Sequence, residues 1–369
     1  MFETEQSMKI FNFSAGPSMI PHKVMDKAQK EFLNYNGMGI GVSELSHRTI
    51  EFSDIIDKTE NNIRKLMNIP TEYSISYIPG GASLQFYMIP ANFLINWWGC
   101  EYIHTGYWSE KAIVEAQKCC YVRVSSSSRD ANFRRIPNLR KWKNNPDSSY
   151  VHITTNNTIE GTQYHSYPEM EYGVPLVADM SSDIMTKVTD IKQFDMVYAS
   201  TQKVLGPTGL ALVIMKKKLT ERSYNKNLPT MLDYNTYIHE KSMHNTPPTF
   251  SVYMLMLVTD WLLEQGGIET MDKINMLKSE VIYEKIDASG GYYKNLVEAP
   301  HRSRVNIVFR LPTKDLSELF IHQAEEEGLL GLRGHRSVEG IRASMYNAMP
   351  LEGVERLVDF MDKFERTHG

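Results

Sequence analysis

The sequence predicts an α/β fold, in which a mostly parallel sheet is flanked by helices, followed by a smaller α+β part. Short apolar runs end in small or polar residues, and segments with apolar residues three and four positions apart lie between many of them. Strands that alternate with helices form largely parallel sheets. After about residue 265 the pattern changes, because long helical segments there surround only short strand-like runs.

Six apolar runs are expected to form strands of the large sheet. Each leads into a small or polar residue, and ligands of open parallel sheets bind beyond the carboxyl ends of the strands. The polar residues that follow these runs are therefore candidates for a binding site. The runs are Ser74–Ile78, Glu101–His104, Tyr150–Ile153, Pro175–Ala178, Met196–Ala199 and Leu210–Met215.

Helices are expected between these strands and in the last third of the chain. Gly266-Gly267 should separate two of them, and the low-complexity stretch Ser125–Ser128 is expected to be a surface loop. The expected helices are Lys23–Tyr35, Ile50–Met67, Leu84–Asn96, Ser109–Lys118, Phe250–Leu263, Glu269–Ile286, Lys314–Glu327 and Leu351–Glu365, with further strands at Arg304–Phe309 and Ile341–Met345.

This pattern predicts two domains and an N-terminal segment. The 369 residues suit about two domains, since roughly 100–200 residues make one. We expect residues 21–265 to form the large α/β domain and residues 266–369 to form the small α+β domain. Residues 1–20 are expected to be an N-terminal segment that packs with the small domain.

The composition is that of an ordinary globular protein, with 42% hydrophobic and 23% charged residues. A net charge of −4 argues against broad nucleic-acid binding. Cys100, Cys119 and Cys120 lack zinc-ligand spacing, so we expect reduced thiols, no metal and a cytoplasmic protein. The acidic start shows no signal peptide, and apolar stretches such as Val252–Val258 are too short to cross a membrane.

Asp179 and Lys203 are the first candidate catalytic residues. Asp179 follows the run Pro175–Ala178, and Lys203 lies in a short polar turn after the run Phe194–Ala199. A lysine amine can form a Schiff base with the aldehyde of pyridoxal phosphate (PLP), and a carboxylate can keep the pyridine nitrogen protonated. Their order and position at strand ends indicate a PLP site, although a turn Asp and a surface Lys would be the ordinary interpretation of each residue alone.

Two further features suit this cofactor. Gly80-Gly81-Ala82-Ser83 lies between a predicted strand and a predicted helix, where backbone N–H groups can bind a phosphate. This loop is neither a Walker loop nor a GxGxxG loop, and glycine-rich turns are common, so the signal alone is weak. Trp108 lies near the start of the next helix and could stack on the pyridine ring, with packing in the core as the alternative.

Two His-Arg pairs and a separate arginine indicate anionic substrates. His47-Arg48 lies near the N-terminus, His335-Arg336 lies in a glycine-rich loop, and Arg342 begins a predicted strand. Guanidinium groups bind carboxylates and phosphates through paired hydrogen bonds. The set suggests a substrate with two kinds of anionic group, whereas exposed loop arginines would explain each pair alone.

Taken together, these segments resemble the phosphoserine aminotransferase family, whose members are fold type I PLP enzymes of aminotransferase class V. The resemblance extends from Ile10 to Gly369 and implies that the large domain binds PLP. Its last three motifs in the chain are highly specific in combination. The strongest motifs are Phe11–Pro17, Ser46-His47-Arg48, Gly106-Tyr107-Trp108, Gln202-Lys203, Asn245–Phe250, Gly334-His335-Arg336 and Arg342–Pro350.

The resemblance implies a role for each matching residue at the cofactor. Lys203 would carry PLP, Asp179 would pair with the pyridine nitrogen, Trp108 would stack on the ring, and Thr158 would hydrogen-bond the phenolate oxygen. Some members have Arg where this chain has Ser83, so the side-chain donors at that position stay open. The phosphate would be bound by Ala82, Ser83 and Gln202 of one subunit and by Asn245 and Thr246 of the other, which implies a homodimer.

The resemblance also implies the reaction, a ping-pong transamination between L-glutamate and 3-phosphohydroxypyruvate. The products would be O-phospho-L-serine, for serine biosynthesis, and 2-oxoglutarate. Use of 4-phosphohydroxy-L-threonine, of pyridoxine biosynthesis, stays open. Arg342 would bind the substrate α-carboxylate, and the phosphate or distal carboxylate would lie among His47, Arg48, His335 and Arg336.

Other classes remain as alternatives. A cysteine desulfurase needs a reactive cysteine in the C-terminal part, whereas all three cysteines precede Lys203. An alanine–glyoxylate type aminotransferase has little use for two His-Arg pairs. A non-catalytic anion-binding α/β protein would keep Lys203 as a structural residue and would lack cofactor absorbance, and a nucleotide-binding protein would need loops that this chain lacks.

Overall fold

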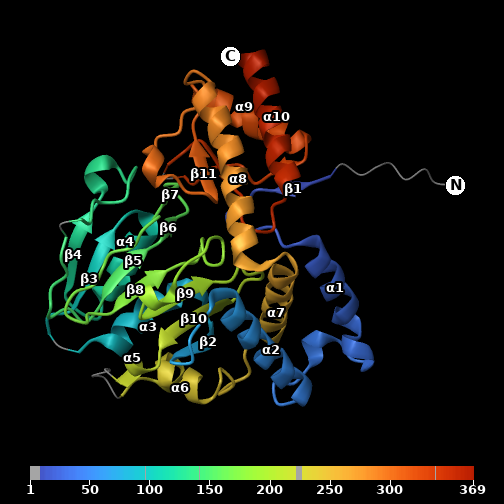
Figure 1. The fold of residues 1–369 in the computed structure, drawn as a ribbon. Helices are drawn as coiled ribbons and strands as arrows, with labels where there is room; N and C mark the ends of the chain where they lie inside the picture. Colours follow the sequence, from blue (N-terminus) through green and yellow to red (C-terminus); the bar gives the residue numbers. More distant parts are fainter. Residues whose placement is uncertain (1–8, 96, 141, 222–226, 337) are drawn as a thin grey trace.

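A seven-stranded sheet forms the centre of the protein's larger part (Figure 1). The computed structural model describes residues 9–95, 97–140, 142–221, 227–336 and 338–369. In spatial order the strands are β2, β10, β9, β8, β5, β3 and β4. Their bounds are β2 (Tyr73–Pro79), β3 (Cys100–His104), β4 (Val122–Ser127), β5 (Val151–Thr154), β8 (Leu176–Asp179), β9 (Met196–Ser200) and β10 (Leu210–Lys216).

The direction of the strands creates one functional edge. Strands β9, β8, β5, β3 and β4 pair in parallel, while β10 runs antiparallel to both β9 and β2. The carboxyl ends of all these strands except β10 therefore lie at the same edge. The predicted α/β class and the mostly parallel sheet are confirmed.

One local prediction is wrong. Ser125–Ser128 was expected to be a surface loop, but β4 continues to Ser127 and pairs in parallel with β3. Because β4 is an edge strand, it needs backbone pairing on one side only and can carry half-exposed serines. Such a strand has no apolar run, so its sequence resembles that of a loop.

Helices cover both faces of the sheet, because side chains alternate between the two faces along each strand. In β9, Val197 and Ala199 join a core that includes α2 and α7, whereas Met196 and Tyr198 join a second core with α3 and α4. The helices of this part are α1 (His22–Leu33), α2 (Ile50–Met67), α3 (Gly81–Phe93), α4 (Tyr107–Ala116), α5 (Lys218–Glu221), α6 (Tyr234–His239) and α7 (Thr249–Glu264).

Two helices at the functional edge begin earlier than predicted. Helix α3 begins at Gly81 rather than Leu84, because Gly80 adopts a left-handed conformation (φ +96°) that turns the chain directly from β2 into the helix. Helix α4 begins at Tyr107, so Trp108 lies in its first turn. Both helix starts therefore lie beside the strand ends.

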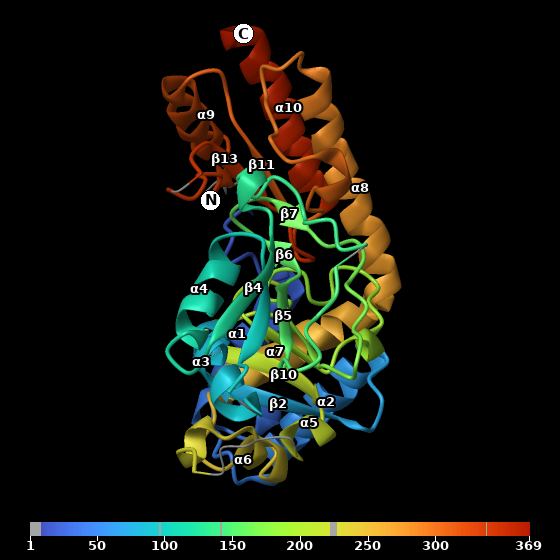
Figure 2. The same ribbon diagram turned by 90° about the vertical axis from the view of Figure 1, so that its left-hand side faces the viewer.

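The C-terminal part has a core of its own, built on aromatic residues such as Phe309, Phe320 and Phe360. Its long helix α8 runs from the end of α7 up beside α10 (Figures 1 and 2). The antiparallel pair β11 and β13 completes this part. Its elements are α8 (Gly267–Ala288), β11 (Asn306–Phe309), α9 (Lys314–Glu326), β12 (Leu329–Leu330), β13 (Ile341–Ser344) and α10 (Leu351–His368).

The N-terminal segment crosses to this C-terminal core. Strand β1 (Phe11–Asn12) pairs in parallel with β12, and Phe13 is buried in the same aromatic core. Residues 1–8 of the predicted segment 1–20 lie outside the described residues. We propose the division into a large domain (21–265) and a small domain (266–369) from these separate cores.

The remaining elements are short. Strands β6 (Asn156–Asn157) and β7 (Thr162–Gln163) form a two-stranded sheet beside the functional edge. None of the described helices is both long and apolar enough to span a bilayer. The 3-10 helices are η1 (Tyr35–Gly37), η2 (Val42–Glu44), η3 (Arg129–Ala131), η4 (Ile191–Gln193), η5 (Thr230–Leu232) and η6 (Ala299–His301).

Candidate active site

A cavity of about 300 Å³ lies at the carboxyl edge of the sheet. The end of β8, the turn after β9 and the starts of α3 and α4 all reach it, which places residues from distant parts of the sequence around one space. Its lining includes six residues predicted from the sequence, namely Ala82, Ser83, Trp108, Asp179, Gln202 and Lys203.

The amine of Lys203 is the central group of this cavity. Its Nζ donates a hydrogen bond to Thr158 Oγ1 over 2.8 Å and lies 5.6 Å from the centre of the Trp108 ring. Burial lowers the pKa of Lys203 to about 8, although the nearby carboxylate of Asp179 acts in the opposite direction. Near neutral pH a larger fraction of this amine is therefore neutral, and nucleophilic, than of an ordinary lysine.

Asp179 ends β8, is buried and lines the cavity. Its Oδ1 accepts a hydrogen bond from the backbone N–H of Ser181 over 2.9 Å. Burial raises the pKa of Asp179, and the hydrogen bonds from Ser181 and the charge of Lys203 lower it. A cationic group placed between these walls would favour the ionised carboxylate.

The N-terminal segment packs against the turn that contains Lys203 and is hydrogen-bonded to it. Ser18 donates its backbone N–H to the carbonyl of Gln202 over 3.0 Å, and its hydroxyl donates to the carbonyl of Lys203. Gly16 leaves room for this approach, since a Cβ there would lie 3.3 Å from the Lys203 side chain. The motif Phe11–Pro17 therefore connects the C-terminal core to the turn that contains Lys203.

The start of α3 forms the candidate phosphate loop. The first N–H groups of a helix have no partner within the helix and attract anions. The turn lies close to β9, because a Cβ on Gly81 would come within 2.8 Å of Ser200 Oγ. The Ser200 hydroxyl in turn donates a hydrogen bond to the side chain of Gln202.

Three other predicted residues come from the C-terminal part of the chain. Arg342, on β13, is close enough to lower the pKa of Lys203 through its charge. His335 packs against Tyr107, with ring centres 5.3 Å apart, and lines a neighbouring hollow of about 410 Å³ together with Arg336. The described lining of the cofactor cavity includes neither His335 nor Arg336.

Two predicted pairs are not part of the described lining of this cavity. His47 and Arg48 precede α2, and Arg48 is exposed. Asn245 and Thr246 precede α7 and are exposed as well. None of the four belongs to the described lining of the cofactor cavity.

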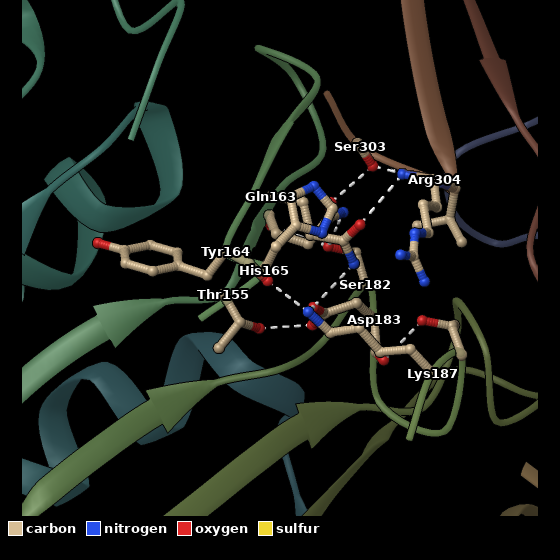
Figure 3. A network of polar contacts seen from close by, with 12 residues as sticks. Thr155, Gln163, Tyr164, His165, Ser182, Asp183, Lys187, Ser303 and Arg304 are labelled. Atoms are coloured by element: carbon tan, nitrogen blue, oxygen red, sulfur yellow. Dashed lines mark hydrogen bonds and ion pairs between the residues drawn. The ribbon is translucent and has the colours of Figure 1, made fainter. Parts of the chain in front are cut away.

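Behind the cavity lies a buried polar network that the sequence did not reveal (Figure 3). Asp183 accepts hydrogen bonds from Thr155 Oγ1 over 2.5 Å and from Gln163 Nε2 over 3.1 Å. The Nζ of Lys187 lies 4.0 Å from Oδ2 of Asp183. The Oε1 of Gln163 accepts a hydrogen bond from the backbone N–H of Arg304 over 3.0 Å. The network thus joins the segment below Asp179 to the C-terminal part of the chain.

The residues present fit PLP. The cavity offers a buried amine for the aldehyde, an aromatic ring at its side, a carboxylate at its base and a helix start for the phosphate. The described residues hold no group of three or more His, Cys, Asp or Glu side chains suited to a metal ion.

Comparison with known proteins agrees with this geometry. The family model described as "Aminotransferase class-V" matches residues 10–357. The chain is 47% identical to a phosphoserine aminotransferase of Bacillus cereus, covering 97% of this chain and 98% of the relative. It is 48% identical to the Geobacillus kaustophilus protein of the same name, covering 97% and 99%.

Solved structures give the same result. The phosphoserine aminotransferase of Bacillus circulans subsp. alkalophilus superimposes with a TM-score of 0.95 at 42% identity, covering 98% of this chain and 99% of that one. A PLP-bound phosphoserine aminotransferase of Trichomonas vaginalis gives 0.90 at 33% identity, covering 96% and 100%. The fold and the site define a PLP-dependent transaminase of class V. Within that class, the chain belongs to the phosphoserine aminotransferase family.

Proposed function

We propose that the protein catalyses the reversible transfer of an amino group from L-glutamate to 3-phosphohydroxypyruvate, which yields O-phospho-L-serine and 2-oxoglutarate. The observation that carries this proposal is the buried amine of Lys203 between Thr158, Trp108 and the carboxylate of Asp179. The names of the relatives that match almost the whole chain support phosphoserine as a substrate.

In this proposal Lys203 carries the cofactor and moves the proton. Bound PLP supplies a ring that accepts the electrons of the substrate Cα–H bond. Once free of the cofactor, Lys203 Nζ would take the proton from the substrate Cα and deliver it to C4′ of the cofactor, which suits an amine whose pKa is about 8. Asp179 holds a proton at the pyridine nitrogen, and Trp108 keeps the ring plane in place.

Charge would select the substrate. Arg342, close to Lys203, binds the α-carboxylate that both amino acids share. The His-Arg pairs at His47-Arg48 and His335-Arg336 bind the phosphate of phosphoserine or the distal carboxylate of glutamate. Unphosphorylated serine would leave these groups without an anion, and unpaired polar groups in a desolvated site are costly.

We further propose a homodimer in which Asn245 and Thr246 reach the partner's cofactor phosphate. Two observations support it: this pair is exposed and is not part of the described lining of its own cavity, and exposed apolar residues occur from the end of α1 to the first residue of α2. Mixing Lys203→Ala subunits with Asn245→Ala/Thr246→Ala subunits should restore one intact site. Lack of restored turnover in a dimer that exchanges subunits would contradict shared sites. The exposed apolar residues are Phe32, Leu33, Met38, Ile40 and Ile50.

Free cysteines support a cytoplasmic enzyme, since Cys100, Cys119 and Cys120 form no disulfide.

The reaction itself is tested by supplying glutamate and 3-phosphohydroxypyruvate to the PLP-loaded protein and measuring phosphoserine by mass spectrometry. Hydroxypyruvate, which lacks the phosphate, is the matched control. We expect rapid conversion of the phosphorylated acceptor only, and equal rates with both acceptors would contradict the proposal.

A further inference from the structure

Tyr198 and His152 form a buried hydrogen-bonded pair beside the candidate active site, and the reaction outlined above gives this pair no role. The Nε2 of His152, on β5, lies 2.8 Å from the hydroxyl oxygen of Tyr198, on β9. Both rings are almost fully buried, so each polar hydrogen of the pair needs an acceptor inside the protein.

The hydrogen bond of this pair crosses β8 next to Asp179. Strand β8 lies between β5 and β9 in the sheet, where Val177 pairs with His152 and Asp179 pairs with Tyr198. Val177 and Asp179 are two positions apart and therefore project from the same face, and Val177 shares the core on that face with Tyr198. The Tyr198 side chain thus reaches His152 across a strand whose one polar side chain at that place is Asp179.

The positions of the hydrogens follow from the surroundings of His152. Burial lowers the pKa of His152 to about 3, so its ring is neutral and carries one N–H hydrogen. The Nδ1 atom is buried without a hydrogen-bond partner among the described residues. A hydrogen on Nδ1 would be an unpaired buried donor, which is rarer in proteins than an unused acceptor. The hydrogen therefore belongs on Nε2, which donates to the Tyr198 oxygen and leaves the Tyr198 hydrogen for another acceptor.

We propose that Tyr198, oriented by His152, is a positioning residue that donates its hydroxyl hydrogen to the carboxylate of Asp179. The inference rests on the proposed function, because it assumes that Asp179 pairs with the pyridine nitrogen of PLP. Burial raises the pKa of Tyr198 well above its ordinary value, and the charge of Asp179 and a hydrogen bond to it raise it further. The phenol therefore keeps its hydrogen and stays a donor.

A second donor would help to keep Asp179 ionised. Burial raises the pKa of Asp179, and the hydrogen bonds from Ser181 act in the opposite direction. The Tyr198 hydroxyl adds to the effect of Ser181, since donors to a carboxylate stabilise its ionised form. Tyr198 is not part of the described lining of the cofactor cavity, so it acts on the pyridine nitrogen through Asp179.

The protonation of the pyridine nitrogen gives the direct test. The enzyme is loaded with PLP that is isotopically labelled at this nitrogen, and its NMR signal shows whether it carries a proton. The wild type should be protonated, whereas Tyr198→Phe should move the signal toward that of the unprotonated ring. Its kcat should fall by about tenfold or more with little change in KM for glutamate, because a hydrogen bond to a charged group is lost.

Tyr150→Phe is the matched control for this substitution. Tyr150 is a buried tyrosine of the same core, and its hydroxyl lies 3.1 Å from that of Tyr102. Losing this hydroxyl removes a buried hydrogen bond that does not involve Asp179, so the signal and kcat should stay those of the wild type. Equal signals in Tyr198→Phe and Tyr150→Phe would overturn the inference.

Two variants of His152 test its orienting role. His152→Phe keeps a ring to stack on Tyr102, whose ring centre lies 4.6 Å from that of His152, but lacks the Nε2 donor. It should move the pyridine signal in the same direction as Tyr198→Phe. His152→Gln, whose side-chain amide can donate to Tyr198, should move the signal less than His152→Phe. The opposite order of these two variants would contradict an orienting hydrogen bond.

The wild type alone provides a second measurement should Tyr198→Phe fail to fold. In protein labelled in its histidine nitrogens, the signal missing from His152→Gln belongs to His152 and should show a hydrogen on Nε2. A hydrogen on Nδ1 would overturn the inference, because Tyr198 would then donate to His152. A pyridine nitrogen protonated in the wild type and unchanged in Tyr198→Phe would refute the inference and leave the proposed function standing. An unprotonated pyridine nitrogen in the wild type would refute the inference together with the proposed role of Asp179.

Discussion

The amine of Lys203 lies 2.8 Å from the hydroxyl of Thr158, although the two residues are 45 positions apart in the sequence. Lys203 lies in the turn after β9, and Thr158 follows β6 beside the carboxyl edge of the sheet. Asp179 is near enough to raise the pKa of Lys203, yet burial has the larger effect and lowers it to about 8. The fold thus keeps a reactive amine at the base of the cofactor cavity.

Covalent capture of PLP by the apoenzyme should follow the titration of Lys203. The neutral amine is the nucleophile, so the rate should rise with pH, change most steeply near pH 8, and level off above it. An ordinary lysine would give this rise near pH 10. Stopped-flow absorbance measures the rate, and a midpoint near pH 10 would contradict the assignment.

Lys203→Ala should bind PLP without a covalent bond and lose transamination by at least about 10³-fold, because both the attachment and the proton transfer are lost. Lys217→Ala, which removes an exposed lysine from the same part of the chain, is the control and should keep wild-type turnover. Wild-type rates in Lys203→Ala would show that another residue does the chemistry.

Asp179→Asn should lower kcat by about 10²-fold or more with little change in fold stability. The amide keeps the acceptor for the Ser181 N–H but no longer holds a proton at the pyridine nitrogen. Steady-state kinetics and thermal unfolding measure the two effects. Asp195→Asn serves as the control because Asp195 precedes β9, at the opposite end of the strands from the cavity. A normal kcat in Asp179→Asn would separate this carboxylate from catalysis.

Arg342→Lys should raise KM by about tenfold for glutamate and for phosphoserine alike, since both carry an α-carboxylate and lysine lacks the paired donors of guanidinium. Arg356→Lys, on the exposed face of α10, should change neither value. A loss confined to phosphoserine would place Arg342 at the phosphate instead.

Lys278→Met tests the contact between α8 and the segment that connects β13 to α10. The buried Nζ of Lys278 donates to the carbonyls of Met345, Tyr346 and Met349 over 3.2, 2.9 and 3.0 Å. Methionine fills similar space but leaves these acceptors unpaired, so the free energy of unfolding should fall by about 2–4 kcal/mol. Urea denaturation measures it, with Lys273→Met, an exposed residue of the same helix, as control. An unchanged midpoint would mean that water satisfies the carbonyls.

The sheet and the family could be predicted from the sequence because their signals are local. Apolar strands such as β8 and β9 end in polar residues, and the order of Asp179 and Lys203 along the chain already indicated one edge. Parallel pairing then brings both residues together. The spacing of apolar residues along the sequence does not give the direction of a strand. The antiparallel orientation of β10 was therefore found only in the structure.

Buried polar residues could not be found in the same way. Asp183 and Gln163 look like turn residues in the sequence, and only the three-dimensional packing brings them together in a buried polar network (Figure 3). Glu160 carries no sequence signal either, beyond its position two residues after Thr158. Its hydrogen-bond partner, the backbone N–H of Tyr107, comes from a distant part of the chain.

The visible absorption spectrum of the PLP-loaded protein tests the central claim most directly. Phosphoserine is added to one sample and serine to another, and the band of the lysine-bound cofactor is followed. We predict that phosphoserine removes this band because it donates its amino group to the cofactor, whereas serine leaves the band in place. A band unchanged by phosphoserine would contradict the assignment of the substrate, and a protein that forms no band with PLP would contradict the role of Lys203.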